Sequence, residues 1–315
     1  MNSNPKTKYL IQLLKVILLV GSIAFIVYKL TVTYKINKRY MDFASMYQPE
    51  FLIYFILAFS LLFLNWFLEV RKWVILVRPY EQFSYQQAAS AVFCGVALSI
   101  ITPNQLGDFA GRVLNLSKLN KLKGALLAVV GHSAQVLVTI VLGLFAYLNL
   151  ILSDSPNFIF WAILFGLLII LSVWFYFNIQ LLSPLFTKIK YLKKYEASFE
   201  VFKEQPLPLL AEILFLSFLR YATYLFQYWF LLKFFQVEIG VLTAFSAIIA
   251  TFFVQSFIPS FLLLELGLRG SGAIWFIGMF SENIPGILLA SYSLWMINMM
   301  LPAFVGLFLI YRIKT

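Results

Sequence analysis

The sequence predicts an all-α polytopic membrane protein with six spanning helices and two re-entrant helical hairpins, eight membrane segments that form an inverted internal repeat. The first observation is composition: the 315-residue chain is 62% hydrophobic and 12% charged, whereas soluble domains are about 45–50% apolar and about 25% charged. The second is a series of apolar runs long enough to cross a membrane. The third is a pattern of Trp, Ala, Pro, an acid and Arg that occurs twice, 156 residues apart.

Composition also limits the classes of function. The net charge of +11 comes from basic residues in short loops beside apolar runs, which predicts contact with anionic lipid rather than with nucleic acid. The single Cys94 excludes a disulfide framework, and the single His132 argues against a histidine metal site. We therefore expect no metal and no cofactor. The sequence contains no Walker A motif, so it gives no sign of ATP hydrolysis.

Several runs have the length of a membrane-spanning helix, which needs about 20 apolar residues. They are Tyr9–Leu30, Phe51–Leu68, Gly124–Leu152, Phe158–Phe177, Leu209–Leu232 and Ile284–Ile310. The first contains Lys15 and lacks a small-residue cleavage site before Lys29, so we interpret it as a retained helix and not as a signal peptide. We treat residues 1–315 as one integral membrane domain.

Two further apolar segments, Ala88–Thr102 and Ala244–Ile258, have only 15 residues each. At about 1.5 Å per residue they cover about 22 Å, less than the hydrocarbon core of about 30 Å. Each runs into a proline, Pro103 or Pro259. If both segments crossed the membrane, the chain would have eight spans, whereas it has six if both dip in and return.

The basic loops favour the arrangement with six spans. It places three basic clusters and both termini on the cytoplasmic side, as the positive-inside rule requires, and the loop around Asp154 outside. Eight spans would invert the rule. The clusters are Arg71, Lys72 and Arg78, then Arg112, Lys118, Lys121 and Lys123, and then Lys188, Lys190, Lys193, Lys194 and Lys203. One group does not fit, because Lys35, Lys38 and Arg39 then lie in an outside loop.

The repeat relates about residues 51–123 to about residues 209–280. Trp73, Ala88, Ser90, Ala91 and Pro103 recur as Trp229, Ala244, Ser246, Ala247 and Pro259, and after one inserted residue Asp108 and Arg112 recur as Glu265 and Arg269. Three crossings separate the copies, an odd number, so the hairpins are expected to enter from opposite faces. The alternative is chance similarity between apolar helices. Ionised side chains at broken apolar segments in matching halves are typical of a transporter site.

The repeated charges form two candidate pairs. Asp108 and Arg112 are four residues apart, as are Glu265 and Arg269, so each pair can share one helix face. A charge at mid-membrane costs at least about 2.5–3.5 kcal/mol, so these residues must pair or face water. Either they hold the hairpins closed, or the arginines bind a phosphate while the acids balance charge. Arginine suits phosphate because its planar guanidinium can donate two parallel hydrogen bonds.

Polar residues at the two breaks have two interpretations. Asn104 and Gln105 at the first break, and Gln255 and Ser256 before the second, could present N–H groups to an anion. They could equally satisfy backbone groups freed at the prolines. We include Asn104 and Gln105 among the candidate substrate-binding residues. A structural role in the hairpins is assigned to Pro103, Gly107, Pro259 and Gly267.

Arg220 is a further candidate for substrate binding because it lies about eleven residues into a span, too deep to reach the interface easily. Its alternative role is an intramolecular pair, with Glu212 as the suggested partner. Glu69, Arg71 and Lys72 are expected to form the solvated end of the second span.

His132 lies in an apolar span together with Gln135. We expect it to make a hydrogen bond between helices, with a proton relay as the alternative.

The run Glu69-Val-Arg71-Lys-Trp73, then Phe83 and Ala88, then Pro103-Asn104-Gln105-Leu-Gly107-Asp108 and Arg112, resembles the membrane region of lysylphosphatidylglycerol synthases. Pro259, Glu265, Gly267, Gly270 and Gly272 look like the second-half element of that family, although the stretch before Glu265 is less glycine-rich. The resemblance covers about residues 10–311. In the synthases this region is similar to a lipid flippase and is followed by an aminoacyltransferase domain. That domain is absent from this sequence, so synthase activity is not carried over and no enzyme activity is expected.

The resemblance implies a lipid translocase of the bacterial inner membrane that moves a phosphate-bearing headgroup of a phospholipid or a polyprenyl-linked lipid, downhill or driven by ions. Two alternatives stay open. One is a membrane enzyme that acts on a lipid-linked phosphate or sugar with Asp108 or Glu265 as base. The other is a non-catalytic partner of an envelope-lipid synthesis complex. The sequence is also compatible with a homo-oligomer.

Overall fold

The computed structural model describes residues 16, 20–21, 23–32, 35, 48–102, 105–188, 191, 193–258 and 262–313. All regular secondary structure in these residues is helical. The long and hairpin helices are α3 (Leu52–Val77), α4 (Tyr85–Ile101), α5 (Gly107–Arg112), α6 (Lys121–Ile151), α7 (Phe158–Phe177), α10 (Leu207–Phe234), α11 (Val241–Phe257), α12 (Leu262–Phe276), α13 (Ile284–Trp295) and α14 (Leu301–Ile313). Shorter pieces are η2 (Pro49–Phe51), η4 (Ile179–Leu181), α8 (Leu182–Thr187), η5 (Lys193–Tyr195), α9 (Glu196–Phe199), η6 (Glu200–Phe202), η7 (Ile277–Met279) and the π-helical η8 (Met296–Met300).

Five helical stretches in the described residues are long and apolar enough to cross a membrane. They are Pro49–Val77, Lys121–Ile151, Phe158–Phe177, Leu207–Phe234 and Ile284–Arg312. Each corresponds to a run predicted from the sequence, so the prediction of a multi-pass helical membrane protein is confirmed. Half of the remaining predicted run, Tyr9–Leu30, lies outside the described residues, which include an apolar helix at Ile23–Val32.

The second span ends later than predicted. Helix α3 continues through the charged residues that were expected to end it and reaches Val77. The two short segments also begin earlier than predicted, at Tyr85 and Val241, and each forms a helix of 17 residues. At about 1.5 Å per residue such a helix is about 26 Å long, which is still less than a hydrocarbon core of about 30 Å.

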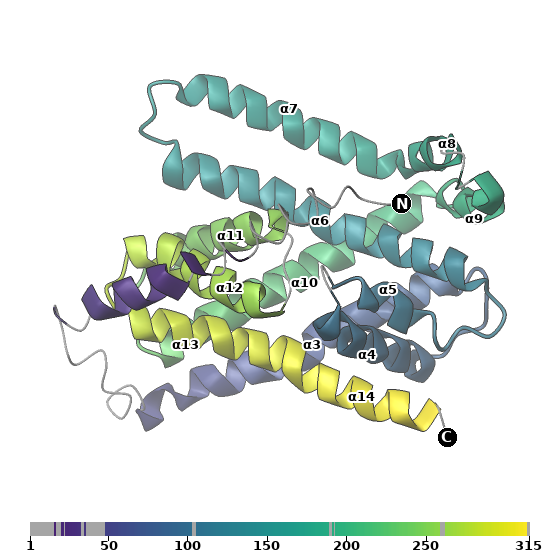
Figure 1. Ribbon diagram of the computed structural model, residues 1–315. Helices are drawn as coiled ribbons and strands as arrows, with labels where there is room; N and C mark the ends of the chain where they lie inside the picture. The colour runs from purple at the N-terminus through teal and green to yellow at the C-terminus, as the bar shows by residue number, and fades with distance from the viewer. Residues whose placement is uncertain are drawn as a thin grey trace.

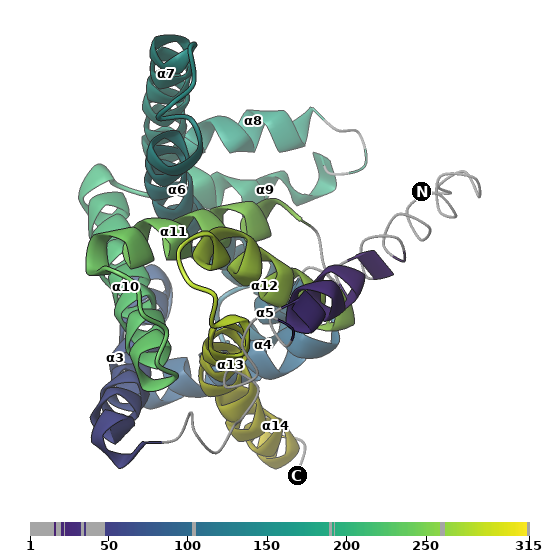
Figure 2. The same cartoon turned by 90° about the vertical axis from the view of Figure 1, so that its left-hand side faces the viewer.

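The two short helices each turn back on a following helix. Helix α4 packs against α5, and α11 packs against α12. Figure 1 shows the α4–α5 hairpin towards one end of the long helices and the α11–α12 hairpin towards the other, with α3 and α10 running in opposite directions. In the view turned by 90° in Figure 2, α11 lies beside α10, against which it packs, and α12 lies beside α11.

The first hairpin is closed by small residues. The N–H of Gly107 donates to Thr102 Oγ1 at 2.7 Å, and a Cβ on Gly107 would overlap the carbonyl of Leu98. A Cβ on Gly111 would overlap the backbone of Gly95 in α4. Gln105, at the tip, has a φ of 57°, in the left-handed region that non-glycine residues rarely adopt. Gly107 therefore lies at a close approach to α4 that leaves no room for a side chain.

The other residues predicted at the hairpin turns either lie outside the described residues or lie away from a turn. Pro103, Asn104 and Pro259 lie outside the described residues. Gly267 is buried within α12, not at the turn, and its carbonyl accepts a hydrogen bond from Ser271 Oγ at 2.8 Å. The close contact with α11 is made by Gly272, where an added Cβ would meet the Gln255 side chain.

The loop that leads into α6 is held by a single carboxylate. Glu81 is 6% exposed and accepts hydrogen bonds from the N–H groups of Ser117, Lys118 and Leu119 and from Ser117 Oγ. Burial raises the pKa of Glu81, but these hydrogen bonds outweigh it and lower the pKa to about 2. The loop therefore depends on an ionised Glu81.

Basic loops gather at one end of the bundle. The start of α6, the short helices α8 and α9, and the end of α14 lie at the same end in Figure 1, and the turn between α6 and α7 lies at the opposite end. Lys121 and Lys123 open α6, and Lys193 and Lys194 lie in η5 just before α9. This grouping agrees with the topology that the positive-inside rule predicts.

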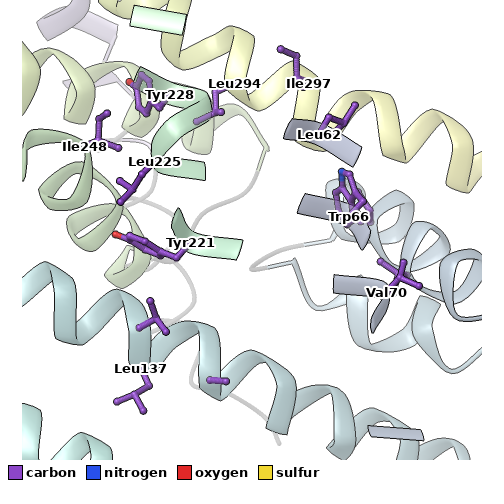
Figure 3. Close-up of a cluster of buried hydrophobic side chains, with 14 of the residues drawn as sticks. Leu62, Trp66, Val70, Leu137, Tyr221, Leu225, Tyr228, Ile248, Leu294 and Ile297 are labelled. Atoms are coloured by element: carbon purple, nitrogen blue, oxygen red, sulfur yellow. The ribbon is translucent and has the colours of Figure 1, made fainter. Parts of the chain in front are cut away.

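The core is built from helices of both halves. Figure 3 shows buried side chains of α3, α6, α10, α11 and α13 turned towards one another, among them Trp66, Tyr221 and Leu294. By contrast, the outer faces of α3 and α7 carry exposed apolar side chains such as Phe63 and Ile159. An apolar exterior of this kind suits contact with lipid.

Candidate functional site

A cavity of about 350 Å³ lies between the two hairpins and is lined by polar residues from both. Its size falls in the range of small-molecule sites, about 300–1,000 Å³. The candidate residues predicted from the sequence that line it are Gln105, Asp108, Arg112, Arg220, Glu265 and Arg269, together with His132, Gln135, Gln255 and Ser256. The structure therefore brings the charged pairs of both repeats to one cavity. Asn104 is the one predicted substrate-binding residue outside the described residues.

The first predicted pair forms within α5 and extends to another helix. Arg112 Nε lies 2.8 Å from Asp108 Oδ2, and Arg112 Nη2 lies 2.7 Å from Glu69 Oε1. All three side chains are at most 7% exposed. The Arg112 guanidinium also lies 5.6 Å from the centre of the Trp73 ring. Asp108 and Arg112 pair as predicted, and the pair is tied to α3.

Glu69 is the centre of this cluster, and its predicted place at a solvated helix end was wrong. Its side chain is 5% exposed and contacts Arg112, Lys72 Nζ at 3.1 Å and Arg220 Nη1 at 3.0 Å. Lys72 is equally buried, so it was misplaced as well. Only Arg71 is exposed as expected. A signal was present in the sequence, because the apolar run resumes at Trp73 and continues to Val77 after the charged residues.

Arg220 has a different partner from the one suggested. It pairs with Glu69, whereas Glu212 pairs with Arg71 near the end of the helices, at 3.3 Å. Arg220 Nε also donates to Asn65 Oδ1 at 2.8 Å. The guanidinium lies 5.5 Å from the ring centres of Trp66 and Tyr224. Both aromatic faces favour a cation there.

A chain of amides continues the network away from Arg220. Asn65 Nδ2 donates to Asn298 Oδ1 at 2.6 Å, and Asn298 Nδ2 donates to Gln227 Oε1 at 3.2 Å. Gln227 in turn donates to the carbonyl of Ala58 at 3.0 Å. Asn298 lies in the π-helical η8, a type of segment that often marks a functional site. Sequence reasoning missed this chain, since no spacing links three amides on separate helices.

The second predicted pair lies across the cavity. Arg269 donates from Nε at 3.0 Å and from Nη2 at 2.6 Å to the same oxygen of Glu265. The Arg269 and Glu265 side chains are 22% and 15% exposed, more than those of the first pair. Both residues belong to α12, so the pair is confirmed, and among the described residues these two side chains form no ion pair with another helix.

His132 on α6 reaches the same carboxylate as Arg112. Its Nε2 lies 2.7 Å from Asp108 Oδ2, so the predicted contact between helices is confirmed. The side chain is 40% exposed and lines the cavity. Its ring also packs against Phe109, with 5.1 Å between ring centres.

The charges of the cluster do not cancel. Lys72, Arg112, Arg220 and Arg269 face three carboxylates, so one positive charge is in excess when His132 is neutral. Within the described part of the chain, no group of three or more His, Cys, Asp or Glu side chains is arranged to hold a metal ion. The arrangement is suited to an anion.

The fold and the cavity together define a class: a multi-pass helical membrane protein with a charged cavity enclosed between its helices. Comparison with known proteins adds no family, because no family model, no curated protein and no solved structure matches the chain.

Proposed function

We propose that this protein is a lipid translocase that moves a phosphate-bearing headgroup across the bacterial inner membrane while the lipid tail stays in the bilayer. One observation carries the proposal: charged residues of both repeats line a single cavity between helices of membrane-spanning length. Ionisable residues inside a membrane protein are costly and usually mark a substrate pathway. The resemblance to the membrane region of lysylphosphatidylglycerol synthases points to the same function.

The arginines supply the chemistry for a phosphate. Arg112 and Arg269 each use Nε and Nη2 for protein carboxylates. Arg220 uses Nη1 for the Glu69 carboxylate and Nε for the Asn65 amide oxygen. Among the described contacts, each guanidinium therefore keeps one further terminal nitrogen for a ligand, since it has five N–H donors. Phosphate oxygens accept such hydrogen bonds strongly. The excess positive charge of the cluster supports the same ligand class.

The proposed topology has six spans and two re-entrant hairpins. The first apolar run, Tyr9–Leu30, is the sixth span, and α4–α5 and α11–α12 enter the membrane from opposite faces as an inverted repeat. The opposite directions of α3 and α10 support this arrangement (Figure 1). Gln105 beside the first tip and Ser256 before the second line the polar cavity, and irregular backbone within a membrane is tolerated beside such a cavity. The end with the basic loops, including both termini, faces the cytoplasm.

A reconstitution experiment tests the proposal. The purified protein is placed in vesicles that contain phosphatidylglycerol with a fluorescent headgroup, and loss of the label to an impermeant reductant reports the movement between leaflets. Arg269→Gln is expected to slow this movement at least tenfold, because it removes a partly exposed cation of the cavity and one charge-assisted hydrogen bond is worth about 1.5–3 kcal/mol.

Arg71→Gln is the matched control, since Arg71 is an exposed arginine whose one ion pair, to Glu212, lies outside the cavity. It is expected to leave the rate unchanged. Equal rates in wild type and Arg269→Gln would refute the assigned role of Arg269, and a wild-type rate equal to that of empty vesicles would refute translocation. Conversion of the lipid without a change of leaflet would instead support the enzyme alternative.

A further inference from the structure

A second hollow lies directly beside the cavity and is almost entirely apolar. This groove, of about 530 Å³, is bounded by α3, α4 and α14. Its walls include Phe63 and Phe67 of α3, Ala89 and Phe93 of α4, and Pro302 and Val305 of α14. Phe63 is 69% exposed, so the groove opens to the outside of the bundle. In a membrane protein this opening faces the lipid tails.

Trp66 is the side chain that the groove and the polar cavity share among the described residues. On the polar side the Arg220 guanidinium lies 5.5 Å from its ring centre. On the apolar side the ring of Phe93 meets it edge-on, with 5.6 Å between centres. Figure 3 shows Trp66 on α3 between Leu62 and Val70. One aromatic ring therefore separates a phosphate-binding environment from an apolar one.

The neighbouring helix is irregular at the same boundary. Asn298 and Met299 of η8 line the cavity, and Leu301 and Pro302, which follow directly, line the groove. The π-helical segment departs from regular α-helical hydrogen bonding, and Pro302 has no N–H to donate. Regular α-helical hydrogen bonding is thus interrupted where the two hollows meet.

We propose that the groove holds one acyl chain of an anionic phospholipid whose phosphate occupies the cavity, so that the lipid lies across Trp66. The inference rests on the proposed function and specifies the substrate as an acylated phospholipid held by both parts. An amphiphile needs a charged site and an apolar site at a fixed short separation, and the two hollows provide this. The concave shape and the continuity with the charged cavity favour a lipid chain over a second copy of the protein.

Photocrosslinking tests the groove directly. Phosphatidylglycerol with a diazirine on one acyl chain is irradiated in vesicles that contain the full chain, and labelled peptides are identified by mass spectrometry. We expect labelling of the α3, α4 and α14 walls to exceed that of the exposed helix α7 by about three- to tenfold. The preference of the acyl chain for the groove is modest because bulk lipid is as apolar as the groove. The preference therefore comes from close packing in the groove and from the bound headgroup. Diacylglycerol with the same labelled chain, which has no phosphate, should show no preference.

Two variants form a matched pair. Ala89→Trp fills the groove, whereas Ala162→Trp adds the same bulk to α7, away from the groove. Ala89→Trp is expected to abolish the preferred labelling, and Ala162→Trp is expected to retain it. Equal labelling of the groove and α7 in wild type would overturn the proposal, as would preferred labelling that persists in Ala89→Trp.

The failure of this inference can be told apart from the failure of the proposed function. Headgroup movement is measured in the same vesicles. Preferred labelling without movement between leaflets would support the lipid site and refute translocation. Movement without preferred labelling would refute the acyl-chain site and leave translocation standing.

Discussion

Glu69 Oε2 lies 3.0 Å from Arg220 Nη1, so a buried ion pair joins α3 to α10 inside the bundle. The same carboxylate also contacts Lys72 and Arg112. A single side chain thus links the two long helices that precede the hairpins with the first hairpin itself. If Glu69 is removed, three cations lose this partner: Lys72 and Arg112, which are buried, and Arg220, which is nearly buried.

Replacement of Glu69 should destabilise the protein strongly. Breaking a buried ion pair from one side costs about 3–5 kcal/mol, because the remaining charge is left uncompensated. Glu69→Gln is therefore expected to lower the thermal midpoint in detergent far more than Glu212→Gln. The Glu212 pair is nearly half exposed and should contribute at most about 1 kcal/mol. Similar midpoints for the two variants would contradict the central role of Glu69.

Close packing in the first hairpin gives a second prediction. Gly111→Ala should cost about 1–3 kcal/mol, because its methyl group would overlap the backbone of Gly95 and force α5 away from α4. Gly166→Ala on α7 is the control, since the space around Gly166 is open. There the change should be neutral or stabilising by up to about 1 kcal/mol through helix propensity. The measurement is the unfolding midpoint, and a neutral Gly111→Ala would show that the hairpin is loosely packed.

The amide chain around η8 gives a third prediction. Asn298→Leu removes the partner of both Asn65 and Gln227, and each buried polar group left unpaired costs about 1–3 kcal/mol. Asn149→Leu is a matched control because the Asn149 side chain is exposed and, within the described part of the chain, bonds only to the carbonyl of Phe145 in its own helix. Unfolding in a denaturant series should separate the two variants. If Asn298→Leu is as stable as the control, the amides do not determine how α3, α10 and η8 pack.

Glu81 gives a prediction about pH. Its pKa is lowered from 4.5 to about 2 in the folded protein, so its stabilising effect is complete above pH 4.5 and is lost as the pH falls towards 2. When the pKa of a carboxyl group is one pH unit lower in the folded state than in the unfolded state, its ionised form stabilises the folded protein by about 1.4 kcal/mol. With solvent screening near the surface, we expect Glu81 to contribute about 2 kcal/mol.

The measurement is stability between pH 2 and pH 5 in wild type and in Glu81→Gln. The variant should be less stable at pH 5 and should lose less stability on acidification. Glu238→Gln, at an exposed position, corrects for the general effect of removing a carboxylate. A pH profile of Glu81→Gln parallel to that of wild type would argue against the role assigned to this loop anchor.

Local patterns in the sequence predicted part of the site. The spacing of four residues placed Asp108 with Arg112 and Glu265 with Arg269, because that spacing is set by the helix alone. The brevity of the segments before Pro103 and Pro259 predicted that α4 and α11 would be shorter than a bilayer core. The sequence placed both pairs at matching positions, and the structure brings them to one cavity.

Contacts between distant helices could not be predicted in this way. Glu69 stood among Arg71 and Lys72, which is the usual appearance of a helix end, and only the packing of α3 against α10 shows that it is enclosed. The partner of Arg220 was assigned to its own helix because no spacing rule connects residues 151 positions apart. Interactions of this kind depend on tertiary packing and leave no periodic signal.

The two halves of the cavity differ in how their charges are attached. Arg112 is bonded to carboxylates on two helices, so α5 cannot shift against α3 without separating opposite charges. Among the described residues, the Arg269 guanidinium forms its ion pair with Glu265, four residues earlier on α12, so both members of this pair belong to the same helix. The Arg112 ion pairs therefore hold the first hairpin against α3. A shift of α12, by contrast, would not separate Arg269 from Glu265, so the second hairpin can move without breaking its own ion pair.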